Sequence, residues 1–321
     1  MEVKATMNKP LDTHPLTGTY WKENYIWAIG MQLCWNQLSD DIIGGPVQLT
    51  KEGQAHQQLV ELFNQKSFDQ SAVSPECLYT NAGFGPQIIK TIQEDLAKDF
   101  PERTTDTLGG LAPALDDLIC FSYLLKKFQH FSLFKEVEMS FLGSKVKGFA
   151  PKTSASYGIE ILDYDDDDNF VLALLSKSKQ DEIILIKGNE TANMEEILHF
   201  ISTPAGGSIP KEGDIIQIPN ITLRLTRDYH ELIDSRLVAE GHDLDGFRLV
   251  KMEEQIRLSL NYIGATVENE AVMVFTRGGM DQPKRLVFDK PFWLIIKETQ
   301  STQPYLILRV NNTAVLEEKT V

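Results

Sequence analysis

The chain has 321 residues, with 31 Lys or Arg against 46 Asp or Glu, so its formal net charge is −15. Its 42% hydrophobic and 24% charged residues are close to the averages of globular proteins and exclude a collagenous, low-complexity or wholly disordered chain. The acidic balance argues against a nucleic-acid partner, and no apolar run approaches the about 20 residues that a membrane-spanning helix needs, so no membrane partner is expected.

The first part of the chain, residues 20–130, has mostly helical apolar spacing. An amphipathic helix is predicted over residues 26–38, where apolar side chains recur at intervals of three and four. A second, short helix is predicted around residues 59–63. A third is predicted to begin at Pro86, because proline suits a first helical turn. The glycine-containing residues 81–86 that lead into it are interpreted as a turn.

The second part, residues 136–321, consists mainly of short runs rich in β-branched residues and separated by polar turns, which is typical of strands. Helical spacing interrupts these runs at residues 194–201 and 228–237. The predicted strands cover residues 139–142, 159–162, 170–175, 183–187, 215–225, 258–267, 271–276, 285–288, 292–297 and 305–310.

Helices first and strands later indicate the α+β class. We expect the N-terminal helices to pack on a large mixed or antiparallel sheet, with additional sheets formed by the C-terminal strands. The sequence contains neither an internal repeat nor a linker rich in Pro, Gly and Ser. One domain over residues 1–321 is therefore predicted, helix-rich over 20–130 and strand-rich over 136–321.

Two acidic segments resemble metal sites only superficially. Residues 163–169 are rich in Asp, but they lack the glycine that a calcium loop needs at its sixth position. Leu174 also stands at the twelfth position, where a bidentate Glu is required. A charged hairpin between two strands is predicted there instead. His242 with Asp243 and Asp245 is interpreted as a polar surface turn rather than a metal site.

The three cysteines, Cys34, Cys77 and Cys120, are odd in number and widely spread. No disulfide framework is therefore expected, and a reducing compartment is favoured. Cys34 and Cys77 lie among apolar neighbours and are predicted to be buried, inert thiols. The first ten residues lack the apolar stretch of a secretory signal. We expect a cytoplasmic protein, or one exported without a cleavable signal peptide.

No arrangement of residues predicts catalysis. The six histidines form no helical metal-binding pair, and the sequence contains no zinc-protease, nucleophile-elbow, phosphate-loop or dinucleotide-binding motif. The expectation is a protein that is not an enzyme and that needs no metal and no cofactor. An enzyme whose site these motifs do not reveal remains a third alternative.

An ordered set of features in the last two thirds of the chain resembles the serpin family. The sequence Phe-Asp-Lys-Pro-Phe-Trp-Leu-Ile-Ile at 288–296, a polar turn and Tyr-Leu-Ile-Leu-Arg-Val-Asn-Asn at 305–312 are similar to the closing hairpin of that family. Residues 216–223, 160–175 and 117–126 resemble further serpin segments, the last of them the central strand of the main sheet, with Phe121 in place of the usual Asn. The resemblance implies a serpin-like α+β fold.

Residues 258–271 resemble the strand that leads into the serpin reactive-centre loop, which inhibitory members insert into a sheet after cleavage. The resemblance places the hinge of that loop at Ala271, Val272 and Val274. Rapid insertion needs a flexible Gly and small side chains, whereas this chain has bulky neighbours such as Met273 and Phe275. The alternation over residues 271–276 favours a strand that already exists in the folded protein.

The exposed remainder, residues 277–287, is expected to be a shortened loop. Gly278 and Gly279 open it, and two positions compete as the bait for a protease: Met280, counted back from Pro291, and Arg285, counted from the hinge. Because a short tether restricts insertion, the hypothesis is a serpin-like protein that binds a protein partner without suicide inhibition. The alternative is a working inhibitor of a serine or cysteine protease that presents residues 277–287 as bait.

Overall fold

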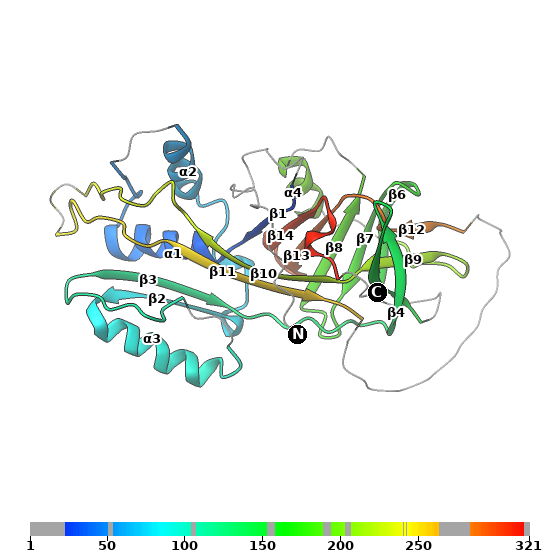
Figure 1. The fold of residues 1–321 in the computed structure, drawn as a ribbon, viewed down its shortest axis with the longest axis horizontal. Helices are drawn as coiled ribbons and strands as arrows, with labels where there is room; N and C mark the ends of the chain where they lie inside the picture. The colour runs from blue at the N-terminus through cyan, green and yellow to red at the C-terminus, as the bar shows by residue number, and fades with distance from the viewer. Residues whose placement is uncertain are drawn as a thin grey trace.

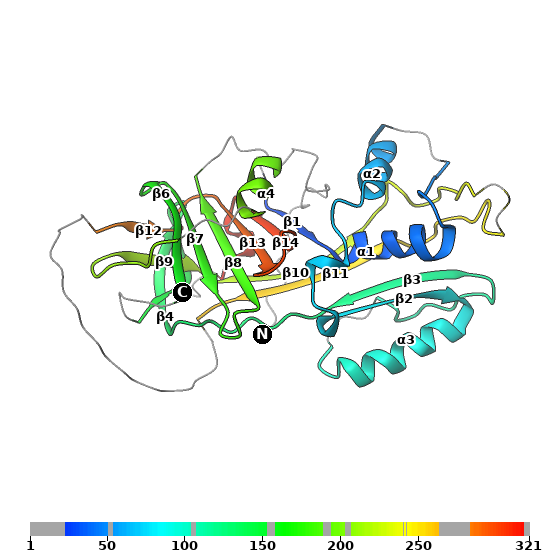
Figure 2. The same cartoon turned by 180° about the vertical axis from the view of Figure 1, so that it is seen from behind.

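The computed structural model describes residues 23–50, 54–103, 107–152, 158–188, 194–202, 207–239, 241, 243–262 and 283–317. Four sheets and a few helices make up this part of the chain, in agreement with the predicted α+β class (Figure 1). Two of the sheets lie together in one half of the molecule. The other two lie beside the longer helices, as the view from behind also shows (Figure 2).

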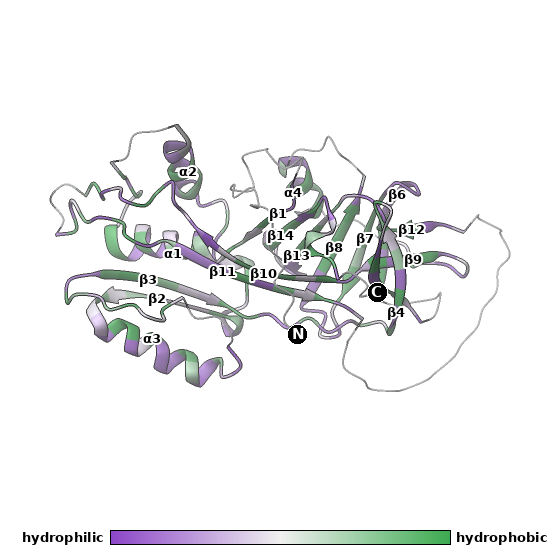
Figure 3. Ribbon diagram, viewed as in Figure 1, coloured by the Kyte–Doolittle hydropathy of each residue, from purple (hydrophilic) through white to green (hydrophobic). Residues whose placement is uncertain are grey.

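The largest sheet has six strands, and each neighbouring pair is antiparallel. The central residues of its middle strands are apolar and buried, because both faces are covered. Figure 3 shows hydrophobic colour along the middle of β8, where Ile183–Ile186 lie between charged ends. In pairing order the strands are β1 (Tyr25–Ala28), β14 (Pro304–Val310), β13 (Phe292–Glu298), β8 (Asp181–Lys187), β7 (Asn169–Leu175) and β6 (Ile159–Asp166).

A second, four-stranded sheet packs beside the first and shares its hydrophobic core. Its strand β12 runs parallel to β9, whereas the other two pairs are antiparallel. In pairing order the strands are β12 (Arg285–Val287), β9 (Ile215–Pro219), β5 (Ser144–Pro151) and β4 (Phe134–Phe141).

Two antiparallel pairs complete the strands: β2 (Leu78–Phe84) with β3 (Leu118–Leu124), and β10 (Ile221–Asp228) with β11 (Glu253–Leu260). One face of the β2–β3 pair packs against α3 (Gly85–Asp99) through a separate apolar cluster. The helices α1 (Gly30–Gln37), α2 (Gln54–Asn64) and α4 (Met194–Ser202) and the short turns η2 (Leu38–Ile43), η3 (Gln70–Ala72), η4 (Pro75–Cys77) and η5 (Thr313–Val315) complete the elements.

The predicted helices around 59–63, from Pro86 and over 194–201 are confirmed as α2, α3 and α4. The helix predicted over 26–38 is partly wrong, since its first residues form β1 and the helix begins only at Gly30. β1 is drawn into the sheet because all four of its residues pair with β14. Tertiary pairing here overrides the local helical spacing.

Three further predictions are wrong. Residues 228–237 form single turns rather than a helix, with Asp234 at a positive φ of 68°. The turn predicted over 81–86 is mostly strand β2, and only Gly85 has a turn conformation, with φ 68°. The single strand predicted over 215–225 is two strands in different sheets, divided at Asn220.

Candidate functional site

A groove separates the two antiparallel pairs, between the facing edges of β3 and β11. Its volume is about 960 Å³, and its walls include all of residues 118–126 and 253–261. Within the described residues, β3 pairs only with β2, and β11 pairs only with β10. Figure 1 shows the two strands side by side with their arrows in the same direction. We call this space, bounded by two strand edges without a strand partner in the described chain, the β3–β11 groove.

The N-terminus of α1 crosses the floor of the groove. The Ser122 hydroxyl on β3 donates to the carbonyl of Gly30 (2.7 Å), and the amide of Met31 donates to the Glu254 carboxylate on β11 (3.3 Å). A side chain at Gly30 would lie only 3.2 Å from Glu254 Oε1 and 3.4 Å from Ser122 Oγ. This α1 crossing, made by Gly30, Ser122 and Glu254, therefore ties both edges of the groove to the end of one helix.

A polar cluster closes the groove where β3 ends. The Lys126 ammonium pairs with Asp181 (3.0 Å) and Glu298, and all three side chains are at most 15% exposed. Burial lowers the pKa of Lys126, but the bonds to Glu298 and Asp181 outweigh it and raise the pKa. Burial raises the pKa of Glu298, and the bonds from Lys126 and Ser74 outweigh that effect and lower it. Both pKa shifts favour the charged forms of Lys126 and Glu298. The pair therefore holds the strands together and is not suited to exchanging protons.

His130 lies at the same end, where the chain leaves β11. Its Nε2 is 2.8 Å from the carbonyl oxygen of Asn261, and its ring packs among Phe128, Phe134 and Phe149. The His130 side chain is 6% exposed, and Nδ1 has no hydrogen-bond partner in the described structure. Burial lowers the pKa of His130, and the contact with Asn261 offsets this only in part. The neutral ring is therefore the form that fits this site.

The lowered pKa of His130 predicts a loss of stability in acid. The unfolded state binds a proton at the ordinary pKa of about 6.5, above the folded value, so stability should fall as the pH drops below that point. His130→Gln can still donate to Asn261 but does not titrate. We expect the stability difference between about pH 7 and about pH 5 to be smaller in this variant, measured by urea unfolding. An equal difference in both proteins would contradict the assignment.

Two thiols line the groove wall. Cys34 on α1 contacts the carbonyl of Cys120 on β3 at 3.8 Å, and both residues are half-buried rather than fully buried. Burial raises the pKa of Cys34 to about 11 and of Cys120 to about 12. Cys77, also half-buried, has a raised pKa for the same main reason.

These raised pKa values predict slow alkylation, because the thiolate is the reactive form. At neutral pH, iodoacetamide should label Cys34 and Cys120 of the folded protein far more slowly than the same residues in urea. Peptide mass spectrometry after timed quenching measures both rates. Equal labelling rates for the folded and unfolded chains would show that the groove does not shield these thiols.

A long connection joins the groove to the second sheet. β11 ends at Leu260, and β12 begins at Arg285, so the connection spans residues 261–284. The strand predicted over 258–267 therefore ends early, since Asn261 and Tyr262 are described outside any strand. This connection has 24 residues, and most of it, with the strand predicted over 271–276 and most of the loop predicted over 277–287, lies outside the described residues.

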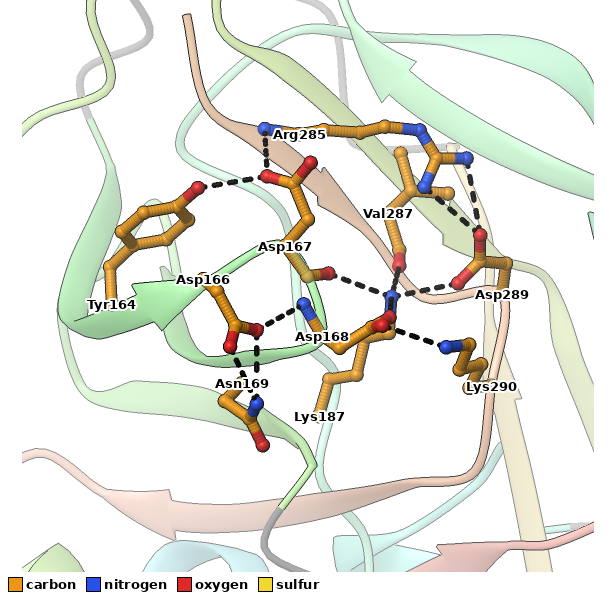
Figure 4. A network of polar contacts seen from close by, with 10 residues as sticks. All are labelled: Tyr164, Asp166, Asp167, Asp168, Asn169, Lys187, Arg285, Val287, Asp289 and Lys290. Carbon is orange, nitrogen blue, oxygen red and sulfur yellow. Dashed lines mark hydrogen bonds and ion pairs between the residues drawn. The ribbon is translucent and has the colours of Figure 1, made fainter. Parts of the chain in front are cut away.

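The far end of this connection is fixed by a polar network (Figure 4). The backbone amide of Arg285 donates to Asp167 (3.1 Å), and its guanidinium donates twice to Asp289 (both 3.1 Å). Lys187, which is 1% exposed, donates to Asp289 (2.7 Å) and to the carbonyl of Val287 (2.8 Å). We call Lys187, Arg285, Asp167 and Asp289 the β12 anchor.

Of the candidate bait and hinge residues, only Arg285 lies in the described structure. It opens strand β12 instead of lying in a loop, and its guanidinium is already paired. Ala271, Val272, Val274, Gly278, Gly279 and Met280 lie outside the described residues. Sequence interpretation missed Ser122 and Glu254, because nothing in either segment signals that the two strands face each other across a helix end.

The acidic segment forms a hairpin turn between β6 and β7, as predicted. Its carboxylates accept from nearby donors: Asp166 from the amide of Asp168 (2.8 Å), and Asp167 from the Tyr164 hydroxyl (2.8 Å). In the part of the chain that the structure describes, no three His, Cys, Asp or Glu residues group as metal ligands. Asp243 and Asp245 lie in turns, and His242 lies outside the described residues.

None of the helices among the described residues has the length and apolar character to cross a membrane.

Comparison with known proteins finds similarity in the structure but none in the sequence. No protein-family model matches the sequence, and no curated protein matches it. The structure is similar to the mouse protein Z-dependent protease inhibitor (TM-score 0.54, 14% identity, 90% of this chain and 91% of that chain). It is also similar to a serpin of the trematode Schistosoma haematobium (0.54, 12%, 92% and 95%) and to Serpin48 of the insect Tenebrio molitor (0.51, 12%, 90% and 92%). The chain therefore has the serpin fold.

Proposed function

We propose that this serpin-fold protein acts by binding another protein through residues 261–284 and that it does not trap a protease covalently. The similar structures include the mouse protein Z-dependent protease inhibitor, which supports a protein partner, with a protease as one candidate. The α1 crossing is the observation that carries the non-trapping part of the proposal. Ser122 on β3 and Glu254 on β11 are both hydrogen-bonded to this helix end, and a strand that enters the groove has to pass between the two edges that these bonds hold.

The residues that would have to pass the crossing are bulky. Val272, Met273, Val274 and Phe275 follow Ala271 in sequence. A strand that separates Ser122 from Glu254 at this point has to strain or break their hydrogen bonds to α1. Because buried polar groups left without partners cost about 1–3 kcal/mol each, insertion past this point should be too slow to outrun hydrolysis of an acylated protease.

Incubation with a panel of serine and cysteine proteases tests this proposal. We expect denaturing gels to show cleavage products but no covalent adduct with the protease. The double variant Met273→Ala with Phe275→Ala removes the bulk and provides the matched comparison, since it should form adducts more readily than the parent chain. A gel-stable adduct of the unmodified protein would overturn the proposal.

A working protease inhibitor is the second candidate function. The length of the connection favours it, because 24 residues between β11 and β12 give more slack than a short loop would. In that case Met280 is the preferred bait, since Arg285 is held in the β12 anchor. Mass spectrometry of an adduct would then place the acylated residue at Met280. Attachment at Arg285 would contradict this preference.

A further inference from the structure

Cys34 on α1 and Cys120 on β3 lie next to each other in the wall of the groove. The Sγ atom of Cys34 is 3.8 Å from the carbonyl oxygen of Cys120, although the two residues are 86 positions apart in sequence. One short side chain therefore already spans the gap between the helix and the strand backbone. A disulfide bond joins two such side chains, and it needs a Cα–Cα distance of about 4.4–6.8 Å.

The local geometry turns both thiols toward the contact between α1 and β3. Ser122 on β3 donates to the carbonyl of Gly30 on α1 (2.7 Å), so the Ser122 side chain points toward the helix. Side chains alternate along a strand, and Cys120, two residues before Ser122, therefore points to the same side. On the helix, Cys34 follows Gly30 by four residues and lies on the same helix face. The helix and the strand thus present the two cysteines to each other.

The spacing along the two elements also matches. Four residues of helix advance by about 6.0 Å, and two residues of strand advance by about 6.6 Å. The hydrogen bond between Gly30 and Ser122 fixes one end of this match. The two cysteines lie at the other end, as their 3.8 Å contact shows. Gly30 allows this close approach, because a Cβ atom there would lie only 3.2 Å from Glu254 Oε1 and 3.4 Å from Ser122 Oγ.

We propose that Cys34 and Cys120 form a disulfide bond when the chain folds in the presence of a low-molecular-weight disulfide such as glutathione disulfide. One protein thiolate attacks glutathione disulfide and releases the first glutathione thiolate. The second protein thiolate then attacks the mixed disulfide and releases the second glutathione thiolate. Two protein thiols are thereby oxidised to one disulfide bond, glutathione disulfide is reduced to two thiols, and the two protons pass to the released glutathione.

The bond forms during folding rather than afterwards. Burial raises the pKa of both thiols in the folded protein, and only the thiolate attacks a disulfide. In the unfolded chain both thiols have the ordinary pKa of about 8.5 and react readily. Cys77 remains a free thiol, so the odd number of cysteines is compatible with one bond.

The bond fastens β3 to α1 beside the α1 crossing. It joins residues 86 positions apart, which removes conformational entropy from the unfolded state. It also holds one edge of the groove close to the hydrogen bond between Ser122 and Gly30. Oxidation therefore stabilises the fold and restrains β3. This inference depends neither on a protein partner nor on a protease, so its failure is separate from failure of the proposed function.

Refolding of the urea-unfolded full chain in a glutathione redox buffer tests the proposal. Peptide mass spectrometry without reduction should find Cys34 joined to Cys120 in about tenfold or greater excess over pairs with Cys77. Loop closure alone predicts the reverse, because Cys77 lies midway between the two in sequence, and loops of half the length form about threefold more often. The oxidised protein should unfold at a higher urea concentration than the same protein after reduction.

Cys77→Ser is the matched control and should keep both the bond and the shift in urea midpoint, whereas Cys34→Ser should lose both. A preference for pairs with Cys77 would show that chain statistics, and not the facing geometry, decide the pairing. Glutathione attached to both Cys34 and Cys120, without a bond between them, would show that the two side chains do not meet. A bond that forms without raising the urea midpoint would contradict the stabilising role.

Discussion

Replacing Lys126 by methionine should lower the free energy of unfolding by about 3–5 kcal/mol, because it leaves Asp181 and Glu298 without their shared partner. The Lys126 side chain is 10% exposed, and its two acidic partners are 6% and 15% exposed, so water replaces little of the lost interaction. Urea unfolding followed by fluorescence measures the change. A loss below about 1 kcal/mol would mean that the cluster is solvated as a surface pair would be.

Lys127→Met is the matched control. Lys127 pairs with Glu102 at 2.7 Å, but the two side chains are 68% and 45% exposed, so water screens this pair and its loss should change stability far less than the loss of Lys126. The difference between the parent chain and Lys126→Met should also shrink in acid. The pKa of Glu298 is lowered in the folded state. Its contribution is therefore present above the ordinary pKa of about 4.3 and is lost as the pH falls below that value.

Lys187→Met should have an effect of similar size, about 3–5 kcal/mol, because it removes the buried cation of the β12 anchor. Lys187 donates to the carbonyls of Asp167 (2.9 Å) and Val287 (2.8 Å) and to Asp289 (2.7 Å). All three acceptors lose a charged donor in the variant. The expected local result is detachment of β12 from β9, seen as faster hydrogen exchange over 285–287.

Lys290→Met separates this effect from a general loss of positive charge. Lys187 and Lys290 both pair with Asp168, at 3.1 and 2.7 Å, but the Lys290 side chain is 57% exposed. Water screens this exposed ammonium, so its removal should cost far less stability than the removal of Lys187 and should leave β12 protected. If the two variants lose equal stability, the burial of Lys187 is not what makes the anchor strong.

Strands are predicted best where their own amino-acid composition identifies them. β7, β8, β13 and β14 are apolar along nearly their whole length and bounded by polar turns, so composition alone identifies them. β1 was missed because only its pairing with β14 makes it a strand. The helix predicted over 228–237 had apolar residues at helical spacing. In the structure, Tyr229 and Leu232 fill a core cluster from turns instead.

The groove could not have been predicted, because it depends on contacts between distant segments. Ser122 and Glu254 meet at the end of α1 across more than 100 positions of sequence. The resemblance to serpins identified the segments 117–126 and 258–271 but placed the strand end too late. β11 stops at Leu260 and Arg285 belongs to strand β12, whereas most residues assigned to the loop lie outside the described part of the chain.

The melting temperature before and after a single cut within residues 278–284 tests most directly whether the connection carries stored energy for insertion. We predict a change of no more than about 3 °C, because under the proposed function the residues freed by the cut do not insert past the α1 crossing; for a chain of this size, about 1 kcal/mol corresponds to about 2–4 °C. A rise of more than about 10 °C would mean that several kcal/mol are released when the freed strand inserts, and the protein would then be a spring-loaded trap.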